Sequence, residues 1–489
     1  MAAGPTGASP RGRFGQSVSR PATSTFLYTR GRSCPRLAGN DVRVRTRFAP
    51  KLGNEIKTIR FGRLRLSTSA GSSDKPSSIW DPSYEWKAVA LLAVSFGLVG
   101  LDRMILAPLF PTMMGDLHMN LQDLGNLVGI LGICWGVSAF LMGGLSDRLG
   151  RRKVLVPAIV IFSLLSWLSG VATGLVSLLV IRAIMGVSEG AVASTGVAIC
   201  TEASYPSRRG INQGIFQCCF ALLGGALAPI IATQMLSFTT WRMVFLLTGI
   251  PGLIVAAIVW RVIREPATVG APKADAAPRP SFGQIFQHRN VLLGMITLIC
   301  AMTGVFVMGA MIPVYLQGFL KLSPQNMGFV ASAAGFGGFL GQFSLPAISD
   351  IIGRKMAILG AFILASIFLF AFSQAGPGNL PLLWVLLFGA SMFSFGALAV
   401  TAGPLAAEAA PLGMVGLVSG MVIGAGEIFG GGVAPSIAGF LAQNYGLPYV
   451  LYFALGGQVL GIVLALFLRE TAPKKVAMAS AAAATAAAE

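Results

Sequence analysis

The chain has 489 residues, of which 54% are hydrophobic and only 11% are charged. So little charge cannot cover the surface of a soluble protein of this length, and the composition therefore predicts a multi-pass protein of the lipid bilayer. The formal net charge of +18 does not indicate a nucleic-acid partner, because residues 1–73 alone have a net charge of +12.

The first 80 residues form a basic segment that we leave out of the fold. They are rich in Arg and Ser, nearly free of acids, and lack the apolar core of a secretory signal. This composition is typical of an organellar transit peptide. A start codon placed too far upstream in a GC-rich genome produces the same composition. The first interpretation predicts an organellar envelope membrane, and the second predicts a bacterial inner membrane.

Twelve apolar runs follow, each long enough to cross a bilayer, which takes about 20 residues. They cover residues 86–111, 124–146, 153–172, 176–203, 213–236, 242–262, 291–319, 326–348, 355–374, 382–409, 413–441 and 447–468. Basic residues gather in alternate loops, whereas the opposite loops contain only Arg242 and Lys321. Because basic loops stay on the cytoplasmic side, we expect both termini in the cytoplasm.

Two sequence patterns occur once in each half of the chain. SDRLGRRK at residues 146–153 returns as SDIIGRK at 349–355, and GGALAP at 224–229 returns as GGGVAP at 430–435. The repeat predicts two six-helix bundles, with a leader, a linker and a tail outside them. The expected parts are a disordered leader at 1–80, an N-terminal bundle at 81–264, a cytoplasmic linker at 265–290, a C-terminal bundle at 291–470 and a disordered Ala-rich tail at 471–489.

The SDRLGRRK pattern follows two glycines and resembles the loop signature of the major facilitator superfamily, with its weaker second copy between spans eight and nine. The resemblance implies an all-α membrane protein of twelve transmembrane helices in two pseudo-symmetric six-helix bundles. Such a transporter binds its substrate between the bundles at mid-membrane and exposes it alternately to the two sides. We expect it to work as a monomer in the bilayer.

The resemblance also implies a gating motif in both halves. Its residues are Gly144, Asp147, Arg148, Gly150, Arg151, Arg152 and Glu202 in the first half, and Asp350, Gly353, Arg354, Lys355 and Glu408 in the second. Asp147 is expected to meet the start of span eleven, where negative charge is favoured at a helix N-terminus, and Glu202 to pair with the motif's arginine. Together they would form a latch that closes in the outward-facing state. The alternative is that the motif only fixes topology, in which case Asp147→Asn would leave transport unchanged.

Five charged residues lie inside predicted spans, where each is costly unless it is paired or lines a wet cavity. They are Asp102 and Arg103 in span one, Arg182 and Glu189 in span four, and Glu427 in span eleven. Arg182 and Glu189 are seven residues apart, so they share a helix face at a separation of about 10 Å. Arg103 and Arg182 are expected at similar depth. Two cations in one cavity predict an anionic substrate.

These charges, together with RAIMGVSEG at residues 182–190, resemble the anion:cation symporter family of sugar-acid/proton symporters, sialin and vesicular glutamate transporters. The resemblance implies that Arg103 and Arg182 hold a substrate carboxylate, while Asp102 and Glu189 exchange the coupled proton. An internal ion pair, such as Asp102 with Arg182, is the alternative. Glu427 is not part of that family's pattern. It either lines the cavity as a third proton-coupling acid or bonds a backbone amide at a kink.

The expected function is proton-coupled symport of a small organic anion, either a monocarboxylate or a sugar acid. Tyr315 and Gln217 are expected to contact it, although either could be an ordinary interhelical hydrogen bonder. A proton-coupled efflux antiporter is the main alternative, since GGALAP partly resembles the span-five signature of drug antiporters but has Ala228 where glycine precedes the proline. The sequence contains no catalytic motif, so we expect no enzyme, and it indicates no cofactor or metal.

Overall fold

The computed structural model of the protein describes residues 81–265, 288–411 and 414–486. The predicted leader and most of the predicted linker lie outside these described residues. Within the described ranges the regular structure is helical throughout, without a strand. This confirms the all-α class.

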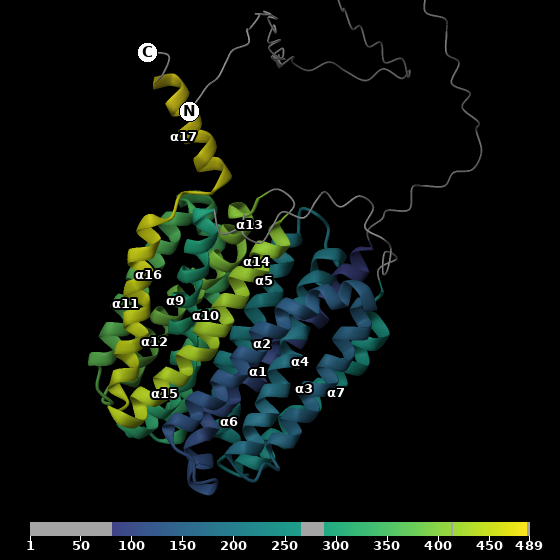
Figure 1. Cartoon of the computed structure of the whole chain (residues 1–489). Helices are drawn as coiled ribbons and strands as arrows, with labels where there is room; N and C mark the ends of the chain where they lie inside the picture. The colour runs from purple at the N-terminus through teal and green to yellow at the C-terminus, as the bar shows by residue number, and fades with distance from the viewer. Residues whose placement is uncertain (1–80, 266–287, 412–413, 487–489) are drawn as a thin grey trace, which may run out of the picture. The chain divides into compact units, whose positions relative to one another are not determined.

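Helices of the two halves form two neighbouring bundles (Figure 1). The N-terminal half contains α1 (Pro82–Asp116), α2 (Leu121–Leu149), α3 (Arg151–Ser169), α4 (Leu175–Ala203), a fifth span made of α5 (Arg209–Phe220), η1 (Ala221–Leu227) and α6 (Ala228–Met235), and α7 (Trp241–Val262). The C-terminal half contains α9 (Arg289–Val314) with η2 (Tyr315–Phe319), α10 (Pro324–Ile352), α11 (Arg354–Gln374), α12 (Leu380–Val400) with η3 (Thr401–Leu405) and α13 (Ala406–Ala409), α14 (Val415–Ala425) with η4 (Gly426–Val433) and α15 (Ala434–Asn444), and α16 (Pro448–Phe467). All twelve predicted spans are present within a few residues of their expected ends.

Eleven of these twelve segments are long and apolar enough to cross a membrane. The twelfth, α10, is just as long but contains five glycines and polar residues such as Gln325, Asn326 and Gln342. Its position explains this composition, because α10 packs on α12 in its own half and on η1 and α6 in the other half. A helix between two bundles needs close backbone approach more than a lipid-facing surface.

The C-terminal tail differs from its prediction. We expected disorder at 471–489, but α17 covers Pro473–Ala486. Alanine makes up much of this segment, and alanine has the highest helix propensity of all residues. We predicted disorder from the low-complexity composition of this segment, but the helix propensity of its alanines favours a helix.

Two equivalent turns join α2 to α3 and α10 to α11. Gly150 has φ 109° and Gly353 has φ 103°, a conformation that side-chain-bearing residues rarely adopt. At each turn a carboxylate from a distant segment accepts hydrogen bonds at the start of the next helix. Glu265 accepts from the Arg152 N–H at 3.0 Å, and Glu470 accepts from the Arg354 N–H at 2.7 Å. Sequence analysis missed these two acids.

The glycine-rich repeats both coincide with a turn of π-helix. The pattern at 224–229 runs from η1 into α6, and that at 430–435 runs from η4 into α15. In each copy a proline, Pro229 or Pro435, is the second residue of the following helix. Proline has no backbone N–H to donate, so a widened turn accommodates the interruption. Such turns are frequent at functional sites.

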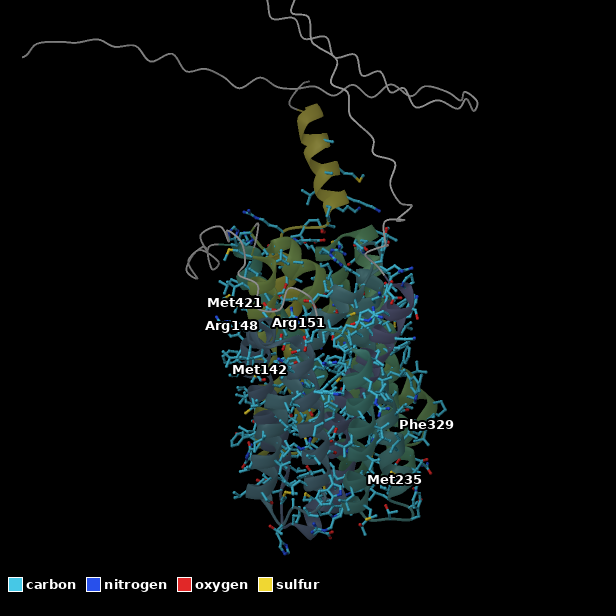
Figure 2. All side chains as sticks on the ribbon, turned by 90° about the vertical axis from the view of Figure 1, so that its right-hand side faces the viewer. Met142, Arg148, Arg151, Met235, Phe329 and Met421 are labelled. Atoms are coloured by element: carbon cyan, nitrogen blue, oxygen red, sulfur yellow. The ribbon has the colours of Figure 1, made fainter. Side chains whose placement is uncertain are left out.

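The two halves pack backbone against backbone at the end remote from the gating motif. Glycines permit this contact: a Cβ on Gly335 of α10 would collide with the Ala226 backbone, and one on Gly125 of α2 would lie 2.5 Å from the Pro435 carbonyl oxygen. Near the motif, by contrast, a Cβ on Gly144 or Gly416 would meet no described atom within 4 Å. Figure 2 shows Arg148 and Arg151 toward one end of the bundles and Met235 and Phe329 toward the other.

Gly335→Ala should shift the protein away from this packed conformation. The added methyl group meets backbone atoms of η1, which cannot rotate away, and overpacking typically costs about 1–3 kcal/mol. In a background without native cysteines, thiol labelling of Met327→Cys, a position only 1% exposed here, should increase with Gly335→Ala.

Gly360→Ala is the matched control, because a Cβ at Gly360 has no described atom within 4 Å. Its labelling should equal that of the parent protein. Equal labelling of both variants would mean that the Gly335 contact does not decide the conformation.

Candidate functional site

All five charged residues predicted inside the membrane are buried. Asp102 and Arg103 are 3% and 4% exposed, Arg182 and Glu189 are 1% and 0% exposed, and Glu427 is 4% exposed. They come from α1, α4 and η4, so both halves contribute. Burial of this kind is costly in a bilayer unless the charges compensate each other.

Arg103 and Glu427 form an ion pair that joins the two halves. Arg103 Nη2 donates to Glu427 Oε2 at 3.0 Å. The guanidinium also lies over the ring of Phe306 on α9, with Cζ 4.0 Å from its centroid, and 5.7 Å from the ring centroid of Trp135 on α2. Glu427 therefore lines the interface between the halves, which favours the first of its two predicted roles over a bond to a backbone amide.

Three consecutive glycines allow η4 to bring Glu427 to this place. A Cβ on Gly430 would lie 2.7 Å from the Ile299 carbonyl oxygen of α9, and one on Gly432 would lie 2.9 Å from the Ile133 backbone nitrogen of α2. A Cβ on Gly431 would lie 2.8 Å from Glu427 Oε2. Side chains here would push η4 away from both neighbours and displace the ion pair.

Arg182 makes its described contacts away from the Arg103–Glu427 pair, and the prediction that both arginines face one cavity stays a prediction. Its Nη1 donates to the Asp102 carbonyl oxygen at 3.2 Å, and its Cζ lies 5.8 Å from the ring centroid of Phe245 on α7. These contacts are all within the N-terminal half. Arg103 instead faces η4 and α9, because consecutive helix residues such as Asp102 and Arg103 point about 100° apart.

Asp102 and Glu189 lie close together between the two arginines. Each interacts electrostatically with the other and with Arg182, and Glu189 also interacts with Arg103. All four carboxyl oxygens are buried without a hydrogen bond of good geometry among the described residues. The alternative of a direct Asp102–Arg182 ion pair is not formed in the described structure, since no such contact within 4 Å joins them.

The gating motif forms matching ion clusters in the two halves. Arg151 binds Asp147 at 2.6 Å and Glu202 at 2.7 Å. In the second copy Arg354 binds Asp350 at 2.5 Å and Glu408 at 2.9 Å. The expected pairing of Glu202 with the motif's arginine is present, and the repeat extends it to Glu408. In this conformation the Asp147 carboxylate lies on Arg151.

The fold, the doubled motif and the buried charges agree with the comparison to known proteins. The sequence profile of the Major Facilitator Superfamily matches residues 92–428 and 320–488. The chain belongs to this superfamily. It is accordingly a multi-pass membrane protein of a transporter family.

Named relatives support a superfamily member of the anion:cation symporter type. The chain is 27% identical to a probable 4-methylmuconolactone transporter of Cupriavidus pinatubonensis, over 59% of this chain and 66% of that protein. It is also 27% identical to a hexuronate transporter of Bacillus subtilis, over 53% of this chain and 63% of that protein. The match thus spans about two thirds of the length of these relatives.

A solved structure shares the fold. It is a bacterial homolog of the human lysosomal transporter Spinster in an inward-facing, unoccupied conformation, with a TM-score of 0.62 and 16% identity over 79% of this chain and 95% of that chain. At this identity the similarity shows the superfamily fold alone.

The structure does not bring Tyr315 and Gln217 to the buried charges. Tyr315 is 2% exposed, stacks on Phe319 with centroids 5.2 Å apart and lies 6.0 Å from Phe372 of α11. These contacts belong to the packing of the C-terminal bundle. Gln217 is exposed on α5. Their predicted contact with substrate stays a prediction.

Two further features were missed by sequence analysis. Glu85, 1% exposed at the start of α1, accepts from the Tyr205 N–H, from Asn212 and from both Nε and Nη2 of Arg208, and this bonding raises the pKa of Arg208. A cavity of about 290 Å³ lies at the packed end, lined by Thr112 and Gln317 among others. Among the described residues no cluster could hold a metal ion.

Arg103→Ala should destabilise the folded protein by about 3–5 kcal/mol, because it leaves Glu427 buried without its counter-charge. Arg103→Ala combined with Glu427→Gln should recover most of this loss, since no uncompensated charge remains. Thermal unfolding in detergent would measure both. Arg264→Ala, at a side chain 64% exposed, is the control and should change little. If the double variant is not more stable than Arg103→Ala alone, the two residues are not coupled.

Proposed function

We propose that this superfamily member transports a small organic anion, a monocarboxylate or sugar acid, together with protons by alternating access. The observation that supports this most directly is the Arg103 guanidinium at the interface of the two halves, with buried carboxyl groups around it. Arginine remains charged and its planar donors match a carboxylate. The substrate classes named for the relatives are organic acids as well, which supports the same assignment.

The balance of buried charge supports proton coupling. Three carboxyl groups, of Asp102, Glu189 and Glu427, accompany the guanidinium groups of Arg103 and Arg182. A single proton would neutralise this cluster, and a bound anion would require one more. Asp102 and Glu189 are suited to take these protons because both carboxyl groups are fully buried and neither forms an ion pair within 4 Å of a described cation.

Orientation follows from the basic loops. If the loops beside the gating motif face the cytoplasm, as the distribution of Lys and Arg supports, the glycine-packed end is the outer end. Both termini would then be cytoplasmic, and the described conformation would be inward-facing. The membrane would be a bacterial inner membrane, or an organellar envelope if residues 1–80 act as a transit peptide.

Purified protein in liposomes should accumulate organic acids when an inwardly directed proton gradient is imposed. The test panel contains 4-hydroxybenzoate, glucuronate and a lipophilic cation. Arg103→Ala and Arg182→Ala should each reduce acid uptake at least about tenfold, which corresponds to 1.4 kcal/mol of lost interaction. Arg264→Ala is the control for loss of an arginine and should transport at the parental rate.

Uptake or expulsion of the cation without any acid transport would replace this proposal with the efflux antiporter. Normal transport by both arginine variants would leave the superfamily assignment intact and remove the anion site.

A further inference from the structure

The Arg103–Glu427 contact differs from the forked arginine–carboxylate pairs of the described chain, whereas the exposed Arg264–Asp81 pair is also held by Nη2 alone. Arg151, Arg208 and Arg354 each use Nε and Nη2 on one acid, which makes a two-point fork. Arg103 uses Nη2 alone. Forked pairs are the stronger and geometrically fixed kind. The pair at the centre of the transporter is therefore more easily exchanged than these forked pairs.

Unused donors surround this single bond. Arg103 Nε and Trp135 Nε1 are both buried without a hydrogen-bond partner among the described residues. Buried donors in this condition normally find an acceptor. The ring of Phe306 covers one face of the guanidinium at 4.0 Å. Arg103 thus has a donor available for a substrate carboxylate that takes the place of Glu427.

From this geometry we infer that Glu427 is an internal competitor of the substrate, which occupies Arg103 in the empty transporter until the substrate carboxylate displaces it. The inference rests on the proposed transport of an organic anion. Displacement leaves Glu427 without its counter-charge inside the membrane, so Glu427 takes up a proton as the anion binds. No bond is made or broken besides this proton transfer. Anion and proton binding are thereby linked at one residue.

The charge state of Glu427 depends above all on its contact with Arg103. Arg103 on α1 is the charged group that acts on it. The elements packed against η4 add Met302 and Phe306 from α9 and Ile133 from α2, which are apolar. The other acids of the cluster, Asp102 and Glu189, act on Arg182 and on each other, and Glu189 also acts on Arg103.

Glu427→Gln should lower the apparent KM for a transported acid at pH 8. If Glu427 occupies Arg103 in roughly nine of ten empty transporters, removing the competitor lowers KM about tenfold. At pH 5.5 the parent and the variant should converge, because protonated Glu427 no longer competes. Glu427→Leu should behave like Glu427→Gln, and Glu427→Asp, which keeps the charge, should stay near the parent. Uptake of 4-hydroxybenzoate and glucuronate into liposomes at both pH values provides the KM.

A second readout is thermal unfolding in detergent with and without the transported acid. The acid should raise the unfolding temperature more in Glu427→Gln than in the parent at pH 8, since it no longer has to displace a bound carboxylate. A raised KM in Glu427→Gln and Glu427→Leu at both pH values would overturn the inference and make Glu427 a brace that positions Arg103. Failure of the parent protein to transport any acid would instead overturn the proposed function, and this inference with it.

Discussion

Charge buried in a low-dielectric interior is the constraint on which this structure depends. The five charged side chains predicted inside the membrane lie 4% exposed or less within the bundles, and each would be prohibitive alone. Interactions with opposite charges reduce the free-energy cost of burying them. Arg182, Asp102 and Glu189 compensate one another inside the N-terminal half, whereas Arg103 finds its counter-charge on Glu427 in the other half. The ion pair of Arg103 therefore depends on contact between the two halves.

Most of the fold could be predicted from the sequence because its determinants are local or repeated. Apolar length indicated the spans and the doubled patterns indicated two bundles, while the family resemblance implied the pairing of Glu202 with the motif's arginine. Glycine-rich stretches also indicate close helix contacts, because membrane helices need small residues to approach each other. The tail is the exception, since alanine content alone did not separate disorder from α17.

The site was predicted only in part, because its geometry depends on tertiary contacts. The charged residues were recognised by their positions in apolar spans, but no local pattern joins Arg103 to Glu427, which are 324 residues apart. A helical wheel gives the 100° between Asp102 and Arg103 without stating which of them faces the other half. The acids Glu265 and Glu470 were missed for the same reason, since each caps a helix far from it in sequence.

The repeat is kept in the motif loops and lost at the buried charges. The motif arginines, their acids and the glycine-proline turns occur in both halves. By contrast, aligning Pro111 with Pro313 places Val305 opposite Arg103, and aligning Glu202 with Glu408 places Phe388 and Phe395 opposite Arg182 and Glu189. Glu427 in turn corresponds to Ala221. The C-terminal half thus has apolar residues at the positions of these charges, and its one buried membrane acid, Glu427, has no counterpart in the N-terminal half and pairs with Arg103. Under the proposed alternating access, that one contact would couple the state of the charge cluster to the approach of the two bundles.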